Sequence, residues 1–336
     1  MTAIAVTVPR MVRATWFKHR TAMLATILVF AVPAVALVIN SAVQRHYLGV
    51  HHLTWCLRID STGTGGSACT SPAWTGFAGV YDSSTVIAIL LLVLAPAVGL
   101  FAGLPWVARE FEGGGFRFTW TQSISSHRWL LGTFGPLTAV AVVAAALCGA
   151  AAYWWHQVAQ WQSGIGDSPW KWTAFELTPL AMLSWTVLAM ALAMLLGVMI
   201  RRLIPAMAAF VVIAGILRWL AAAWLRPHLL SIGQIVRQVP YSYAGSSLGR
   251  SSVLLQDWFT TPSGARLSLD TVYLRMGNLQ GDPSTWLAQH HLSYWMAYQT
   301  HDRLIWFQLA WPAIVLAAAI PLVLAAIWWL RRRPAG

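Results

Sequence analysis

The sequence predicts an all-α integral membrane protein with six transmembrane helices. Of its 336 residues, 58% are hydrophobic and only 10% are charged, whereas charged residues make up about a quarter of a soluble domain. The apolar residues gather in six runs, each long enough to cross a bilayer as a helix. We expect the spans at about residues 21–43, 85–107, 131–155, 175–200, 203–225 and 304–330.

Residues 1–20 form a basic leader ahead of the first span, and its cationic side chains are Arg10, Arg13, Lys18 and Arg20. The apolar run that follows has full span length and ends in Asn40 and Ser41 without a clear small-residue cleavage site. We therefore interpret the leader as uncleaved. Its apolar side chains at helical spacing indicate an amphipathic elbow at the inner membrane surface, and a disordered basic tail is the alternative.

The distribution of charge predicts that both termini lie in the cytosol. With the amino terminus inside, the inner segments hold 12 of the 22 basic residues and two of the ten acidic ones. The outer segments then hold nine basic and eight acidic residues, and short loops rich in Lys and Arg face the cytosol in membrane proteins. The net charge of +12 thus sorts by membrane side, and no basic face for nucleic acid is expected.

Residues 108–130, between the second and third spans, read AREFEGGGFRFTWTQSISSHRWL. Charged and aromatic side chains alternate here, which suits a short helix that lies on the membrane surface or docks into another protein. The glycines at 113–115 allow the chain to turn sharply between two arms. The simpler alternative is a solvated turn between two spans.

This segment resembles the cytosolic hairpin of actinobacterial ABC exporter permeases, the ABC type-2 permease family. The matching positions are Ala108, Arg109, Glu110, Glu112, Arg117, Trp120, Thr121, Gln122, Ser123, Arg128, Trp129 and Leu130. Gly115 replaces the usual Thr, and Ser126 replaces a residue that is often basic. A second resemblance, to the segment before the last span of the family, rests on Tyr298, Gln299, Arg303, Phe307 and Gln308.

The resemblance implies a transmembrane permease subunit of an ABC exporter in a bacterial plasma membrane. Such a subunit pairs with a second copy or a paralogous permease and with two copies of a separate ABC ATPase subunit, which binds ATP and Mg. The hairpin serves as the coupling element that inserts into the ATPase, and the expected contacts are Arg109, Glu110, Glu112, Arg117, Thr121, Gln122 and Arg128. The implied substrate is an amphipathic or hydrophobic small molecule, such as a drug or antibiotic, which leaves by alternating access.

The chain has no motif for catalysis of its own. It lacks a G-x-x-x-x-G-K-[ST] phosphate loop, an H-E-x-x-H sequence and a G-x-S-x-G sequence, so we expect a transport subunit without a cofactor. Two alternatives remain open. One is a membrane-embedded transferase at the outer face, for which acidic residues are present without a recognisable pattern, and the other is a non-transporting sensor or scaffold.

Ionisable residues within spans are candidates for a substrate path. Arg218 lies about eight residues, or about 12 Å of helix, from the outer end of the fifth span. Glu176 lies near the outer start of the fourth span, and Gln308 near the outer end of the sixth. Arg218 and Glu176 either pair across a cavity or each extend to the outer interface, and the second placement is the simpler one.

The outer segments are predicted at residues 44–84 and 226–303. The first contains Cys56 and Cys69, which can form a disulfide in an oxidising compartment, and the sequence leaves open whether they are bonded. His51, His52 and Cys56 lack a fourth ligand at a recognisable spacing, so no metal site is predicted. The fold of residues 226–303 is not predicted by any pattern that we recognise.

Overall fold

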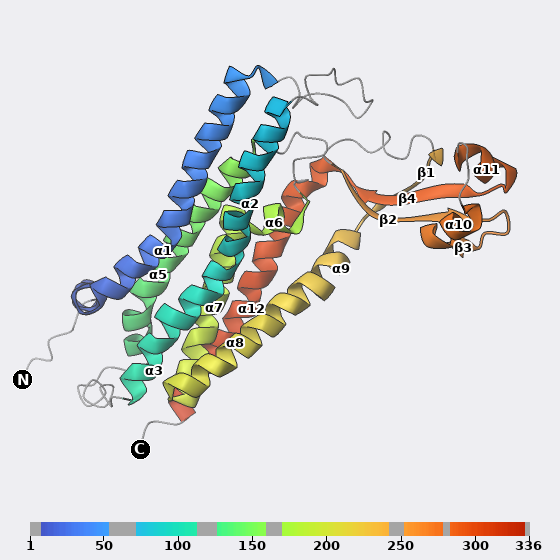
Figure 1. Cartoon of the computed structure of the whole chain (residues 1–336). Coiled ribbons are helices and arrows are strands. Elements are labelled where there is room, and N and C mark those ends of the chain that lie inside the picture. The colour runs from blue at the N-terminus through green and yellow to red at the C-terminus, as the bar shows by residue number, and fades with distance from the viewer. Residues whose placement is uncertain are drawn as a thin grey trace, which may run out of the picture.

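The computed structural model describes residues 8–53, 72–112, 126–158, 170–241, 252–277 and 283–332. Within these ranges, six helical segments are long and apolar enough to cross a membrane. The helices that form them are α1 (Val8–Val50), α2 (Pro72–Val98) continued by α3 (Leu104–Glu112), α5 (Ser126–His156), α7 (Pro179–Ile200), α8 (Leu203–Leu220) continued by α9 (Arg226–Ser231), and α12 (Leu304–Arg332). The described part of the chain is therefore a helical bundle with six candidate membrane spans (Figure 1).

Helix α7 forms the centre of the bundle, because most of its side chains are buried among α3, α5, α8 and α12. It begins at Pro179, four residues after the predicted start, and Phe175 lies in a separate short helix, α6 (Trp172–Glu176). The break has a local cause. The Thr178 hydroxyl accepts a hydrogen bond from the Ala181 amide at 3.3 Å, and Pro179 occupies the first helical turn, which is a strong helix start signal.

Two of the spans contain a π-helical turn just before a proline. The turn η3 (Gly99–Gly103) precedes Pro105, and η4 (Ala221–Leu225) precedes Pro227. A proline ring clashes with the carbonyl group four residues earlier in an α-helix, and a widened turn is one way to relieve that clash. The fifth span can therefore continue to Ser231, six residues past its predicted end at residue 225.

One end of the bundle collects the basic inner residues. Figure 1 places the end of α3, the α7–α8 turn and the end of α12 together at this end. The first turns of α1 lie there too and are seen nearly end-on, so this helix changes direction before its apolar part. The predicted elbow residues from Val8 onward belong to α1 as one continuous helix. The other end of the bundle carries the segment between α9 and α12.

This segment departs from the all-α prediction, because it contains a four-stranded antiparallel sheet in the order β1-β4-β2-β3. The strands and helices of the segment are β1 (Ile235–Gln238), β2 (Val253–Thr260), β3 (Arg266–Leu267), α10 (Leu269–Met276), α11 (Pro283–Gln289), β4 (Ser293–Gln299) and the 3-10 turn η6 (His301–Arg303). Phe259, Val272 and Met296 are fully or almost fully buried in its own apolar core. The sheet extends sideways from the end of the bundle opposite the last turns of α3 and α12 (Figure 1).

Gln299 and Arg303, two residues of the second family resemblance, attach the sheet to the bundle. The buried Gln299 amide donates to the carbonyl oxygens of Leu230 at 2.9 Å and Ile232 at 3.0 Å. Arg303 donates to the carbonyl oxygen of Gly233, whose φ of +65° suits glycine. These contacts fix the corner between α9 and β1 against the start of α12.

Candidate functional site

The last turns of α3 form the described arm of the predicted hairpin. Helix α3 is amphipathic, and its buried face consists of Leu104, Trp106, Val107, Ala108 and Phe111. Arg109 is exposed and Glu110 is half-buried. The buried face packs closely on α7, because a Cβ atom on Gly197 would lie only 2.8 Å from the Cβ atom of Val107. Helix α3 is therefore held directly against the inner end of α7.

Glu112, the last residue of α3, accepts a hydrogen bond from the backbone amide of Leu203 at 2.7 Å. Leu203 begins α8, and the first amides of a helix lack partners within it. The N-cap residue of α8, Arg202, makes no side-chain cap, so the Glu112 carboxylate supplies one from α3. A carboxylate at this position also interacts favourably with the positive end of the helix dipole.

A second contact joins α3 to the same turn. Arg201 ends α7 in a left-handed conformation with φ of 56°, and its guanidinium carbon lies 5.5 Å from the centre of the Phe111 ring. This distance is within the range of a cation–π interaction. We call the contacts of Phe111 and Glu112 with Arg201 and Leu203 the inner clasp.

The described part of the structure contains only some of the seven residues that are predicted to contact the ATPase. Arg109, Glu110 and Glu112 lie on α3 as described, and Glu112 has an intramolecular partner that the sequence did not predict. Arg128 lies in the first turn of α5, but its side chain is outside the described part of the structure. Arg117, Thr121 and Gln122 lie outside the described residues. Contact between these residues and an ATPase stays a prediction.

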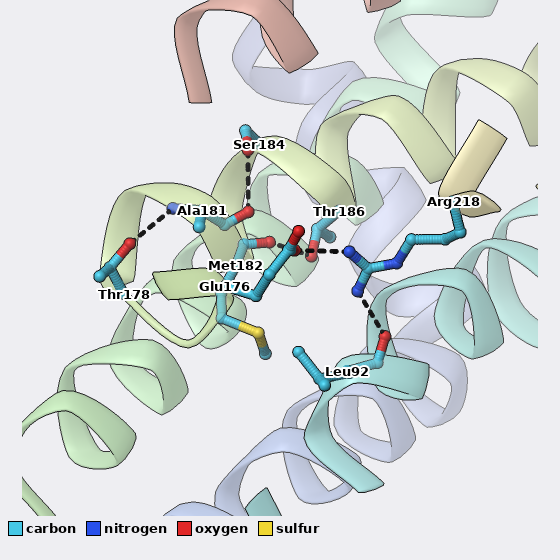
Figure 2. Close-up of polar contacts among 8 residues, drawn as sticks. All are labelled: Leu92, Glu176, Thr178, Ala181, Met182, Ser184, Thr186 and Arg218. Carbon is cyan, nitrogen blue, oxygen red and sulfur yellow. Dashed lines mark hydrogen bonds and ion pairs between the residues drawn. The ribbon is translucent and has the colours of Figure 1, made fainter. Parts of the chain in front are cut away.

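At the other half of the bundle, Arg218 and Glu176 form an ion pair. The Arg218 Nη1 and Glu176 Oε2 atoms are 2.5 Å apart, and the side chains are 25% and 9% exposed. Figure 2 shows the two side chains pointing at one another between α6 and α8. Of the two placements that the sequence allowed, pairing is therefore observed, and the extension of each side chain to the outer interface is not.

Arg218 also contacts α2 and α7. Its Nη2 atom donates to the carbonyl oxygen of Leu92 at 2.8 Å (Figure 2), and its guanidinium carbon lies 4.0 Å from the centre of the Trp185 ring. The Leu92 carbonyl is available because residue 96, which would bond to it in a regular helix, is a proline without an amide hydrogen. One guanidinium thus joins four helical elements.

The surroundings of this pair leave little free space. A cavity between Pro96, Trp185 and Arg218 measures about 20 Å³, which is room for about one water molecule. Arg226 donates to the carbonyl oxygen of Trp170 and lies 5.7 Å from the centre of the Phe175 ring. Among the residues of the pair, Arg218 packs directly on an aromatic ring, that of Trp185.

Gln308, the third predicted substrate-path residue, does not join this pair. It lies half-buried on α12, and its side chain makes no hydrogen bond with the residues that the structure describes. The structure therefore brings together two of the three residues that the sequence singled out.

Two larger apolar cavities lie along α1. One, of about 450 Å³, lies between α1 and α5 and is lined by residues such as Phe30, Val140 and Leu147. The other, of about 470 Å³, lies between α1 and the α2–α3 segment, with Val29 and Phe101 in its wall and Arg109 and Glu110 at one end. Volumes of this size match small-molecule sites.

The outer segment contains a cluster of tyrosines outside the membrane spans. The hydroxyls of Tyr241 and Tyr273 are 2.6 Å apart, and Tyr294 donates to the Asp257 carboxylate at 2.7 Å. The hydrogen bond with Tyr273, followed by burial, raises the pKa of Tyr241 to about 12. Burial and the bond to Asp257 raise the pKa of Tyr294 well above its ordinary value.

The remaining sequence predictions concern cysteines and metals. Cys56 and Cys69 lie outside the described residues. Cys148 is a free, buried thiol on α5. In the described ranges, no group of three or more His, Cys, Asp or Glu side chains is arranged to hold a metal ion.

Comparison with known proteins identifies the family. The model of the family described as "ABC-2 membrane transporter related" matches residues 13–226, which is more than half of the chain. The chain belongs to this family. No curated protein and no solved structure matches the chain significantly. As an ABC-2 family member, it is a multi-pass permease subunit of an ABC transporter, and its family implies an ABC ATPase partner.

The match covers α3, the α7–α8 turn and both residues of the ion pair, whereas the sheet and α12 lie beyond it. Sequence reasoning missed two contacts of this ABC-2 permease, namely Glu112 with Leu203 and Arg218 with Leu92. The second had a signal in the sequence, because Pro96 leaves the carbonyl four residues earlier without a donor. The first had none, since its partners are 91 residues apart.

Proposed function

We propose that this ABC-2 permease exports an amphipathic or hydrophobic small molecule, such as a drug or antibiotic. A separate ATPase drives this export by moving the predicted hairpin, residues 108–130, whose first arm is the end of α3. The observation that carries the proposal is the exposed end of α3. The Arg109 side chain is exposed there, while the inner clasp fixes the same helix to α7 and α8. A force applied to the hairpin thus reaches the transmembrane core.

The assembly that we propose contains two permeases, either identical or paralogous, and two ATPase subunits that bind ATP and Mg. It resides in a bacterial plasma membrane, with both termini in the cytosol. The clustering of basic residues supports this orientation, since Arg109, Arg201 and Arg331 lie on elements that meet at one end of the bundle (Figure 1). That end also presents the hairpin to a cytosolic partner.

The apolar cavities support an amphipathic substrate. The cavity between α1 and the α2–α3 segment has a mostly apolar wall, with Arg109 and Glu110 at one end. Such a surface offers room for a hydrocarbon body and a polar contact for a charged head. ATP binding by the partner would alternate the spans between inward-open and outward-open states, with no chemistry on the permease itself.

The first test is affinity purification of the tagged chain in mild detergent, followed by an ATPase assay on the eluate. We expect a soluble partner with a phosphate-binding loop to co-purify and to hydrolyse ATP. Glu110→Ala should reduce the amount of ATPase partner that is recovered, or its rate of ATP hydrolysis, because Glu110 lies on α3, the arm of the hairpin that we propose contacts the ATPase. Asp270→Ala, which removes an exposed carboxylate from α10 in the outer segment, serves as the control and should change neither.

Recovery of the folded chain alone, without ATPase activity, would contradict the export proposal. An outer-face transferase or a non-transporting scaffold would then become the better explanation. Recovery of the partner with equal activity for wild type and Glu110→Ala would retain the transporter assignment but remove Glu110 from the contact.

A further inference from the structure

We infer that Glu112 is a positioning residue that binds the hairpin to α8, so that movement of the hairpin reaches the Arg218–Glu176 pair through α8. The inference rests on the proposed function, because it assumes that an ATPase moves the hairpin. It assigns Glu112 to an intramolecular contact instead of a contact with the ATPase. The role of Glu112 is then to transmit motion, while its neighbours bind the partner.

The inner end of α8 depends on Glu112 for its cap. The helix has no acidic residue in its own first turn, and its N-cap residue makes no side-chain hydrogen bond. The Leu203 amide receives its acceptor from Glu112. Arg201 and Arg202 flank this contact, so the carboxylate also lies in a positively charged surrounding. Displacing α3 without α8 would separate an amide from its acceptor.

Helix α8 connects this cap to the ion pair without interruption. Leu203 and Arg218 belong to the same α-helix, and their separation of 15 positions corresponds to about 22 Å. The π-helical turn η4 begins only after Leu220. A displacement at Leu203 is thus carried to Arg218 along a regular helix, which transmits it with little bending.

The alternative route through α2 contains a hinge. Between Glu112 and Leu92, the chain passes through the π-helical turn η3 and past two prolines, Pro96 and Pro105. Such turns are places where a helix bends. Since Arg218 bonds to Leu92, the two routes meet at the ion pair. A shift of the hairpin would bend the α2–α3 segment at its hinge, whereas it would move α8 as a rigid helix. The resulting displacement would therefore act on the contacts of Arg218 with Glu176 and Leu92.

Hydrogen exchange measured by mass spectrometry tests this inference without a known substrate. The purified permease–ATPase complex in nanodiscs is compared with and without Mg-ATP and vanadate. In the wild type, we expect nucleotide to change amide exchange in the hairpin and also in the outer residues 170–178 and 226–231, because α8 connects them. Glu112→Ala should retain the bound ATPase, its hydrolysis and the hairpin response, and should lose the response of both outer peptides.

Two conservative variants separate the hydrogen bond from the charge. Glu112→Gln keeps an oxygen at the same reach and should preserve the outer response, whereas Glu112→Asp keeps the charge on a shorter side chain and should lose it. This pair also decides the question if Glu112→Ala does not fold. Asp270→Ala is the control that removes a carboxylate elsewhere, and it should behave as the wild type.

Three results would overturn the inference while leaving the proposed function intact. They are an unchanged outer response in Glu112→Ala, loss of the ATPase subunit from that variant, and an outer response that survives in Glu112→Asp but not in Glu112→Gln. The last two would make Glu112 a charged contact of the ATPase. Failure of the proposed function looks different, because the wild-type chain would then retain no ATPase at all.

Discussion

Replacement of Arg218 by alanine should destabilise the bundle more than the same replacement of an exposed arginine. The Glu176 side chain is only 9% exposed, and without Arg218 its carboxylate loses the partner 2.5 Å away. The Leu92 carbonyl loses its donor at the same time. Removal of one member of a buried ion pair costs about 3–5 kcal/mol, because the other charge stays buried and uncompensated. We expect a free-energy loss of this size for Arg218→Ala.

Thermal unfolding of the purified chain, followed by tryptophan fluorescence, measures this loss. At about 2 °C for each kcal/mol, Arg218→Ala should lower the midpoint by about 6–10 °C. Arg237→Ala, at an exposed position on β1, is the matched control and should shift it by about 1 °C or less. The double variant Arg218→Ala/Glu176→Ala should be more stable than Arg218→Ala, because it removes the isolated charge.

Two results would refute this reasoning. The first is an equal midpoint for Arg218→Ala and Arg237→Ala, which would mean that the pair contributes no more than a surface contact. The second is a double variant whose loss equals the sum of the two single losses, which would mean that Arg218 and Glu176 do not interact energetically.

Three further predictions use the same preparation. Gly99→Ala should cost about 1–3 kcal/mol, because its Cβ atom would lie 2.9 Å from the backbone oxygen of Ala189, whereas Gly215→Ala meets nothing within 4 Å and should leave stability unchanged or slightly higher in the same thermal assay. Pro96→Ala supplies an amide that competes for the Leu92 carbonyl, so Arg218→Ala should cost about 1 kcal/mol less in that background. The raised pKa of Tyr241 means that its folded form retains the proton longer; its contribution to stability is complete below pH 10.0 and is lost as the pH rises through about 12. Tyrosinate absorbance of the wild type minus that of Tyr241→Phe should therefore titrate near pH 12, and titration near pH 10 would contradict the hydrogen bond.

Six helices of membrane-spanning length could be predicted because helix length and apolar content are local properties. Each predicted apolar run overlaps one of the six helical segments that are long and apolar enough to cross a membrane. The difference between the predicted and the observed start of the fourth span has a local cause that is present in the sequence. Thr178 followed by Pro179 is a helix start signal, and it moves the beginning of the fourth span to Pro179. The pairing of Arg218 with Glu176 was one of two placements that the sequence left open.

The outer sheet was not predictable in the same way, because its strands pair with distant partners. Strand β4 lies between β1 and β2, which come from parts of the chain well before it. Strands β1 and β3 have only four and two residues, and β1 is exposed along its whole length, so it lacks the alternation that marks a half-buried strand. The cap of Leu203 by Glu112 escaped prediction for the same reason, since a contact over 91 residues leaves no local pattern.

Stability alone does not explain why Arg218 lies in the fifth span. Well-packed apolar residues of similar volume often stabilise a protein as well as a buried ion pair does, or better. Arg218 instead makes directional contacts with Glu176, Leu92 and Trp185, each from a different element. Directional contacts of this kind hold one relative position of the helices and are lost together when that position changes. An apolar contact would permit gradual sliding, so the arginine favours a discrete position of α8 over a graded one, which is what the alternating access proposed above would require.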